Sequence, residues 1–240
     1  MLTLIITSGR NMEKFTLRER EIFRILKIIK DFEFVIIGGY AVNAFTLPRF
    51  SVDCDLVVKN SNELDDLRNI LGMNGYYKSK DFVENDVPYK NKFERWVKEI
   101  MPSFEVSLDI LIDNVLDRNT KAKFSADWVF ENSKVRTLKG KTIREQLKAR
   151  IVNPDALFAM KLSICRQNDV RDLFLLIPLI DNKEWIKKEV SSRYEFKERL
   201  SKALKYINSK QFKDSLQGVF GMIDNKLFDK NKKLMLSLQE

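Results

Sequence analysis

The chain has 240 residues, with 43 Lys and Arg against 34 Asp and Glu, a net charge of +9, no histidine and two cysteines. The lack of histidine excludes Ser-His-Asp triads and His-ligated metal sites. Two isolated cysteines make neither a disulfide framework nor a zinc-ligand spacing, so we expect a reducing, cytoplasmic location. No apolar run approaches the roughly 20 residues that a membrane-spanning helix needs, so we expect no membrane partner.

The remaining chemical inventory favours oxygen ligands. Catalysis in this chain has to use carboxylates, Lys, Arg, Tyr, Ser or Cys, and such side chains suit Mg²⁺ or Mn²⁺ better than zinc. The basic excess favours polyanionic partners such as nucleic acid or nucleotides. A surface that only keeps the protein in solution explains the same charge equally well.

The first elements are predicted as a helix, a strand, a short helix and a second strand. Residues 16–19 read Thr-Leu-Arg-Glu, a capping box, and apolar residues follow at helical spacing, which predicts a helix over 17–30. The apolar, β-branched run 34–37 predicts a buried strand that ends at two glycines. A short helix over 40–45 and a strand over 51–58 follow.

The next segment continues the sheet. Residues 62–73 are amphipathic at helical spacing and predict a helix. Residues 89–98 and 104–112 predict two strands with Pro102 in the bend between them. Weaker strand patterns lie at 135–138 and 149–152.

The last part of the chain is predicted to be helical. Asn153 is a good helix cap and Pro154 fits the first helical position, where its missing N–H costs nothing. Later helices are clearest at 196–207 and 212–228. We therefore expect an α/β (α+β) fold, a mixed sheet with flanking helices in a domain over 1–152, and a helical domain over 153–240.

Two aspartates on the second strand carry the strongest chemical signal. Asp53 and Asp55 are two residues apart, so both carboxylates point to one face of the strand. Val52, Cys54 and Leu56 point to the other face and should pack in the core. Two adjacent carboxylates repel unless a cation lies between them, so the pattern predicts a divalent metal site. A solvated strand edge is the alternative.

A third carboxylate is expected from the strand over 104–112. Asp109 lies in mid-strand, where an ionised side chain is costly unless it is paired or bound to metal. Glu105 and Asp113 share its face and are its rivals for this role. A salt-bridged aspartate at a sheet edge is the alternative.

The glycine pair suggests a phosphate site. Gly38 and Gly39 follow a strand, and without Cβ atoms they let the backbone approach a phosphate closely. The N–H groups at the start of the next helix would point at the anion. A tight strand-to-helix turn is the alternative.

Two motif blocks resemble the nucleotidyltransferase superfamily, in particular its AbiEii-type branch, which includes toxins of toxin–antitoxin systems. The first block is Gly38-Gly39 followed by Arg49-Phe50-Ser51-Val52-Asp53-Cys54-Asp55. The second is Asn153 to Leu162 with its Pro and Lys, followed by Asp169 and Asp172, with Asn168 where the family often has Lys. The resemblance covers roughly residues 34–175.

The resemblance implies a nucleotidyltransferase-like fold and a role for each matching residue. Asp53, Asp55 and Asp109 would bind Mg²⁺ or Mn²⁺ and act in catalysis, with Asp109 helping to deprotonate the acceptor. The nucleotide-binding positions would be Gly38, Gly39, Arg49, Ser51, Lys161, Asp169 and Asp172, with Lys161 also catalytic through its contact with the triphosphate.

Several of these residues have a structural alternative. Arg49 could be a partner of the aspartates, and Lys161 could lie at the rim of an apolar helix face with only its charge exposed. Asp169 and Asp172 could cap a helix start and pair with Arg166 or Arg171. Ser51 is better explained as a turn residue than as a nucleophile, since no base is available.

The expected function is metal-dependent transfer of a nucleoside monophosphate from a nucleoside triphosphate to an acceptor hydroxyl. An RNA or tRNA 3′ end is the favoured acceptor, with a protein side chain or a small molecule as alternatives. The resemblance also implies a toxin of a toxin–antitoxin pair, with a cognate antitoxin as partner. The rival hypothesis is a non-catalytic nucleotide- or RNA-binding module with the same fold.

Overall fold

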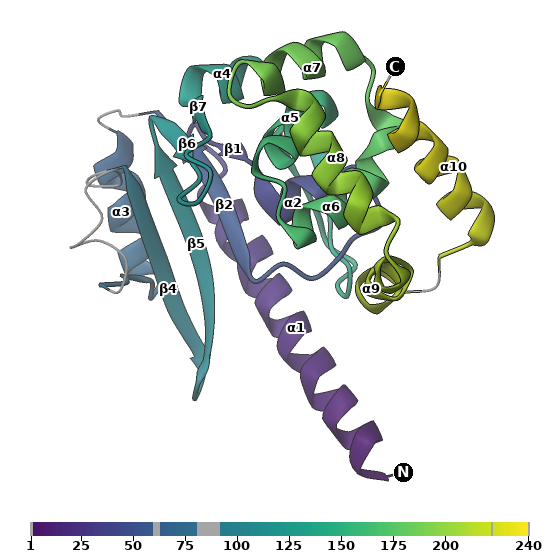
Figure 1. Ribbon diagram of the computed structural model, residues 1–240. Helices are drawn as coiled ribbons and strands as arrows, with labels where there is room; N and C mark the ends of the chain where they lie inside the picture. Colours follow the sequence, from purple (N-terminus) through teal and green to yellow (C-terminus); the bar gives the residue numbers. More distant parts are fainter. Residues whose placement is uncertain (1, 60–62, 81–91, 222, 240) are drawn as a thin grey trace.

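The computed structural model describes residues 2–59, 63–80, 92–221 and 223–239 (Figure 1). The strands are β1 (Val35–Ile36), β2 (Asp53–Val58), β3 (Tyr77–Lys78), β4 (Phe93–Met101), β5 (Phe104–Ile112), β6 (Asn114–Leu116), β7 (Lys123–Ser125), β8 (Ser133–Lys139) and β9 (Gln146–Val152). The helices are α1 (Leu2–Ile28), α2 (Gly38–Asn43), α3 (Glu63–Met73), α4 (Ala126–Glu131), α5 (Pro154–Ile164), α6 (Gln167–Leu176), α7 (Lys183–Ser191), α8 (Phe196–Ile207), α9 (Lys210–Phe220) and α10 (Asn225–Leu236).

A seven-stranded mixed sheet forms the centre of the molecule, in the order β3-β4-β5-β2-β1-β9-β8. β2 runs parallel to β5 and β1 runs parallel to β9, while the other neighbours are antiparallel. Strands β6 and β7 form a separate pair. Helices α5 to α8 gather on one side of the sheet, and α3 lies beside β4 (Figure 1). The predicted mixed α/β class is confirmed.

Helix α1 is longer than predicted and packs against β5 and β9. Its buried face, which includes Ile22, Phe23 and Leu26, joins the main core. The predicted start at residue 17 is wrong, and so is the capping box. The Thr16 hydroxyl donates to the carbonyl of Met12, at 3.0 Å, as it would within a continuing helix. The N–H groups there are already bonded within the helix and need no cap.

Glu19, the other half of the predicted capping box, is buried and has a different role. Its carboxylate accepts hydrogen bonds from the backbone N–H groups of Lys141 and Thr142, at 2.6 and 2.7 Å. The Thr142 hydroxyl adds a third bond at 2.7 Å. Glu19 therefore ties the loop between β8 and β9 to α1.

The predicted strand and helix around the glycine pair exist, with shifted limits. β1 is only two residues long, and α2 begins at Gly38 instead of at residue 40. The glycines therefore form the first turn of the helix, which has only six residues.

The other predicted elements of the sheet are close to the observed ones. β5 matches the predicted strand over 104–112, and β8 and β9 extend the two weaker predictions. β4 runs on to Met101, while positions 89–91 of that prediction lie outside the described residues. α3 begins at Glu63, and position 62 also lies outside.

The helical part begins as predicted. The Asn153 side chain accepts a hydrogen bond from the N–H of Ala156, at 2.9 Å, and Pro154 opens α5. The change from strand to helix falls between β9 and α5, but the division into two domains stays a prediction. In the described parts of the chain, no helix is long and apolar enough to cross a membrane.

The single helix predicted over 212–228 is wrong. α9 ends at Phe220, and Gly221 follows with a φ of 85°, a left-handed conformation that breaks the helix. Asp224 then caps α10 by accepting a hydrogen bond from the N–H of Lys226, at 3.2 Å. The apolar spacing continued across the break, so periodicity alone did not reveal it.

Candidate active site

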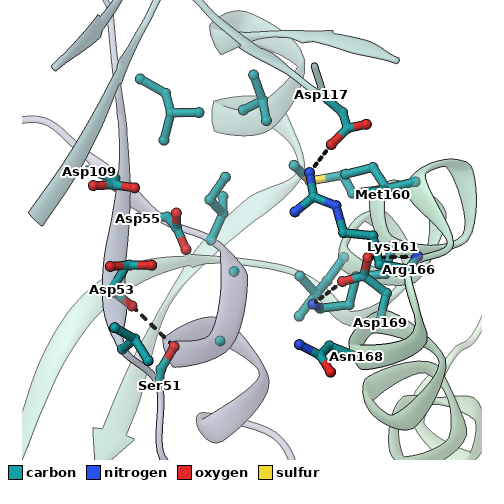
Figure 2. Close-up of a pocket in the computed structure, with 18 of the residues that line it drawn as sticks. Ser51, Asp53, Asp55, Asp109, Asp117, Met160, Lys161, Arg166, Asn168 and Asp169 are labelled. Atoms are coloured by element: carbon teal, nitrogen blue, oxygen red, sulfur yellow. Dashed lines mark hydrogen bonds and ion pairs between the residues drawn. The ribbon is translucent and has the colours of Figure 1, made fainter. Parts of the chain in front are cut away.

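A cavity of about 640 Å³ lies between the sheet and helices α5 and α6. Figure 2 shows its two sides. Asp53, Asp55 and Asp109 lie along one side, which we call the carboxylate wall. On the opposite side, which we call the helical wall, lie Lys161, Arg166, Asn168 and Asp169. A cavity of this size suits a small-molecule ligand.

The carboxylate wall is formed by two neighbouring parallel strands. The pairing of β2 with β5 places Asp55 opposite Asp109 and Asp53 opposite Ser107. Neighbouring strands are separated by about 4.8 Å, so side chains at paired positions on one face meet. The structure therefore brings together the three aspartates that the sequence singled out.

The rivals of Asp109 do not reach the cavity. Glu105 is exposed and accepts a hydrogen bond from the Tyr77 hydroxyl at 2.8 Å. Asp113 follows the end of β5 with a φ of 63° and does not line the cavity. Asp109 is 5% exposed and belongs to a strand with neighbours on both sides, not to a sheet edge.

Val52 corrects the prediction for the opposite face. Cys54 and Leu56 are fully buried as expected, but Val52 is 60% exposed. Val52 precedes the first residue of β2, so the alternation of the strand does not extend to it.

Arg95 is a site residue that the sequence reading missed. Its Nε and Nη2 donate to the two carboxylate oxygens of Asp109 at 2.8 and 2.7 Å. Its Nη2 also lies 3.7 Å from Oδ1 of Asp53. The antiparallel pairing of β4 with β5 puts Arg95 directly opposite Asp109. The predicted bend at Pro102 was the signal that could have revealed this pair, since a hairpin centred there aligns the two residues.

The other contacts of the carboxylate wall are hydroxyl donors. The Ser107 hydroxyl donates to Oδ1 of Asp53 at 2.5 Å. The Ser51 hydroxyl donates to the backbone carbonyl of Asp53 at 3.1 Å. Ser51 therefore acts as a turn residue in this structure.

The carboxylate wall holds more negative charge than its neighbours neutralise. The pKa of Asp55 is raised to about 7, first by burial and then by the nearby Asp109 and Asp53 carboxylates, whose effect exceeds the opposite effect of Lys161 and Arg95. Burial also raises the pKa of Asp109, although Arg95 opposes that shift. A buried carboxylate of this kind is stabilised by a cation.

Two of the three aspartates of the carboxylate wall are suited to bind a divalent cation. No group of three or more Asp, Glu, Cys or His side chains within the described residues is arranged to hold a metal as it stands. Asp109 is engaged by Arg95, so Asp53 and Asp55 are the residues that would hold Mg²⁺ or Mn²⁺. Oxygen atoms of substrate and water would complete such a site, as Mg²⁺ sites commonly require.

The glycine pair is explained by contacts with the same strand. Gly38 has a φ of 64°, and a Cβ atom there would overlap with Oδ2 of Asp55. A Cβ atom on Gly39 would overlap with the Ser51 hydroxyl. Both glycines line the cavity, and their role as a phosphate cradle stays a prediction.

The helical wall is held by a network of ion pairs. Arg49 donates from Nε and Nη2 to Asp172, both at 2.8 Å. Lys161 lies 2.8 Å from the same carboxylate and 3.1 Å from Asp169. Arg49 thus pairs with the helix and not with the strand aspartates. Asp172 is only 1% exposed and does not line the cavity.

Charges in this network balance. Burial alone would raise the pKa of Asp172, but Lys161 and Arg49 outweigh it and lower that pKa. Burial alone would lower the pKa of Lys161, but Asp172 and Asp169 raise it. The Lys161 ammonium is therefore already satisfied, and its contact with a triphosphate stays a prediction.

Asp169 and Asp172 have separate roles in this network. Asp169 also accepts a hydrogen bond from the N–H of Arg166 at 3.1 Å, so it caps the start of α6 as the structural alternative proposed. The alternative in which Asp172 pairs with Arg166 or Arg171 is wrong, because Asp172 pairs with Arg49 and Lys161.

Arg166 is an exposed cation of the helical wall, with 59% of its side chain accessible. It pairs with Asp117, which also accepts hydrogen bonds from the N–H and hydroxyl of Thr120, at 2.8 and 2.9 Å. Arg118 and Arg171 also line the cavity. The sequence reading did not identify Asp117 or Arg118, because no local motif contains them.

No protein-family model matches the sequence. No curated protein matches it either. Two solved structures are similar to the chain at 18% identity, both covering 97% of it. One is a candidate nucleotidyltransferase from H. pylori, covered over 93% of its length with a TM-score of 0.45. The other is JHP933 from Helicobacter pylori, covered over 90% with a TM-score of 0.48. Since both TM-scores lie below 0.5, neither similarity assigns a family or a function.

Proposed function

We propose that the protein is a metal-dependent nucleotidyltransferase that moves a nucleoside monophosphate from a nucleoside triphosphate to an acceptor hydroxyl. The observation that carries this proposal is the carboxylate wall. Asp53, Asp55 and Asp109 meet on adjacent strands and face a cavity lined on its other side by arginines. The resemblance to AbiEii-type nucleotidyltransferases rests on the same residues.

The two walls suit the two parts of such a reaction. Asp53 and Asp55 would hold Mg²⁺ or Mn²⁺, which when bound stabilises the charge that develops on the entering and leaving oxygens. Asp109 lies beside them and would accept the proton of the acceptor hydroxyl once freed from Arg95. Arg166, Arg118 and Arg171 line the cavity where a triphosphate would need positive charge.

An RNA or tRNA 3′ end is the favoured acceptor, because the net charge of +9 favours a polyanionic partner. A protein side chain and a small molecule are the other acceptors to test. A role as the toxin of a toxin–antitoxin pair, with an antitoxin partner in the cytoplasm, belongs to the same proposal and rests on the family resemblance alone.

A nucleotide- or RNA-binding module without transferase activity is the second candidate. One observation favours it: Asp109 is held in a two-point salt bridge with Arg95 and so is not available to accept a proton in this conformation. Such a module would bind triphosphate without releasing pyrophosphate.

A transfer assay distinguishes the two candidates. Purified protein, Mg²⁺ or Mn²⁺, total RNA and each labelled nucleoside triphosphate in turn would be incubated, and pyrophosphate would be measured. We expect label in RNA and a loss of more than about 10²-fold in Asp53→Ala, since the metal ligand is lost. Asp66→Ala is the control, because Asp66 is exposed on α3 and does not line the cavity.

Each outcome has a clear meaning. Label in protein instead of RNA would keep the transferase and change its acceptor. Triphosphate binding without label or pyrophosphate would favour the binding module. Transfer that survives Asp53→Ala would overturn the assigned site.

A further inference from the structure

We propose that Arg95 is a built-in counter-ion of the carboxylate wall, which competes with the divalent cation and must leave Asp109 before the site is fully loaded. This inference rests on the proposed function, because it concerns the metal site of the same cavity. It assigns a role to a residue that belongs to none of the sequence motifs.

The contacts of Arg95 place its positive charge where the wall is most negative. The guanidinium holds both oxygens of Asp109, at 2.8 and 2.7 Å, and lies 3.7 Å from Oδ1 of Asp53. The pKa of its own guanidinium is raised mainly by its bond to Asp109, with additional effects from Asp53 and Asp55. One cation therefore pairs with Asp109, lies near Asp53, and acts on Asp55 through its charge alone.

Arg95 and a metal ion compete for the same oxygens. A carboxylate that accepts a two-point hydrogen bond from an arginine has fewer lone pairs to offer a metal. Two cations near the same carboxylates also repel each other. Metal binding therefore has to weaken the Arg95 pairs, and the Arg95 pairs have to weaken metal binding.

The geometry allows the guanidinium to move. The Arg95 side chain is 24% exposed and lines the cavity, whereas that of Asp109 is 8% exposed. A side chain that reaches the cavity can turn into it without breaking the sheet, because the β4–β5 ladder is held by backbone hydrogen bonds.

The opposite face of β4 offers a matched comparison. Glu94, the neighbour of Arg95, accepts two hydrogen bonds from Arg68, at 3.2 and 2.6 Å. It also accepts bonds from Lys78 and Trp96, each at 2.9 Å. Arg68 thus makes a similar pair away from the cavity, and loss of its charge leaves Glu94 with two donors.

The experiment is a titration of the nucleotide-free protein with Mn²⁺. Binding is measured by calorimetry and by the electron paramagnetic resonance signal of free Mn²⁺. Wild type, Arg95→Met, Arg68→Met and Asp53→Ala would be compared at one ionic strength. We expect Arg95→Met to bind Mn²⁺ about tenfold more tightly than wild type, within the usual range of coupling between two ligands. Arg68→Met removes the same charge and should bind as wild type does.

Folding of the variants is checked by thermal unfolding with and without Mn²⁺. Arg95→Met leaves Asp109 without its partner, so Mn²⁺ should raise its unfolding temperature more than that of wild type. Arg95→Lys keeps the charge but not the two-point bond, and its Mn²⁺ affinity should lie between those of wild type and Arg95→Met. This second variant tests the inference even if Arg95→Met does not fold.

Three results would overturn the inference. Folded Arg95→Met could bind Mn²⁺ no more tightly than wild type, or Arg68→Met could tighten binding equally, which would show a general charge effect. Both results would leave the proposed function intact. If neither wild type nor Arg95→Met binds Mn²⁺ in a way that depends on Asp53, the inference fails, and the transfer assay with triphosphate present decides the proposed function.

Discussion

The carboxylate wall and the helical wall line the same cavity but differ in how far their charges are neutralised by neighbouring residues. On the helical wall, Arg49 and Lys161 are matched by Asp172 and Asp169 in a closed network of ion pairs. On the carboxylate wall, Arg95 pairs with Asp109 and lies near Asp53, while burial and the other two carboxylates raise the pKa of Asp55 to about 7.

This difference separates charged groups that are neutralised by their neighbours from carboxylates whose charge their neighbours do not fully neutralise. A balanced, buried network loses stability when any member is removed. An excess of like charge costs stability in the empty protein and becomes favourable only when a cation arrives. Variants on the two walls should therefore change the free energy of unfolding in opposite directions.

The largest effect is expected from Lys161→Met. This change leaves Asp169 without its lysine and Asp172 with Arg49 alone, so the free energy of unfolding should fall by about 3–5 kcal/mol. Urea unfolding followed by circular dichroism measures it. Lys205→Met, at an exposed position of α8, is the control and should stay within about 0.5 kcal/mol of wild type. Equal stability of the two variants would show that the network does not hold the helical wall.

Gly38→Ala should have the next largest effect, because it disrupts the close contact between α2 and Asp55 of the carboxylate wall. The new Cβ would displace the Asp55 carboxylate, and the φ of 64° disfavours alanine. We expect a loss of more than about 2 kcal/mol in the free energy of unfolding.

Gly72→Ala provides the matched comparison for that variant. Gly72 lies in α3, and a Cβ there would meet no heavy atom within 4 Å. Alanine at this position should stabilise the protein by about 0.5–1 kcal/mol in the same unfolding measurement. Destabilisation by both changes to a similar extent would contradict the contact with Asp55.

Asp55→Asn, unlike Lys161→Met and Gly38→Ala, should stabilise the metal-free protein. The folded pKa of Asp55 is about 7, above the ordinary value of roughly 4 expected when unfolded. The folded wild type therefore holds a proton that the unfolded chain releases, and its stability falls as pH rises from about 4 to about 7. Asn lacks this penalty, so we expect a gain of about 1–3 kcal/mol at pH 7.

Unfolding in EDTA at several pH values checks the sign. The difference between Asp55→Asn and wild type should be small near pH 4, grow up to about pH 7 and stay constant above it. Asp66→Asn, at an exposed position, is the matched control. An Asp55→Asn variant that is less stable than wild type at every pH would contradict the excess of charge on this wall.

Arg166→Gln should have the smallest effect on stability. The side chain is 59% exposed, and Asp117 keeps its bonds to Thr120, so we expect a loss below about 1 kcal/mol. Affinity for a fluorescent nucleoside triphosphate should still fall by about tenfold, since a charge facing the ligand is lost. Unchanged affinity would place the triphosphate away from Arg166.

The helix and strand pattern of the site could largely be read from the sequence. The two-residue period of a strand put Asp53 and Asp55 on one face, and the mid-strand position of Asp109 marked a third carboxylate. Asn153 and Pro154 located the start of α5 through local hydrogen bonding alone. These features were predictable because each depends on residues only a few positions apart.

The partners of the charged residues depended on distant parts of the chain. The pairing of Arg95 with Asp109 depends on the register of β4 and β5, and the pairing of Arg49 with Asp172 joins positions 123 residues apart. The capping box at Thr16 failed for the same reason, since Glu19 is used by a loop that follows β8.

The sequence by itself determined the mixed α/β class and the residues of the carboxylate wall, through alternation and helix-capping chemistry that act over a few residues. Only the tertiary structure decided that Lys161 and Arg49 neutralise Asp172 while Arg95 pairs with Asp109 and lies near Asp53. The physical reason is that the energy of a charge depends on its burial and on its nearest partners, and both are set by how the sheet and helices pack.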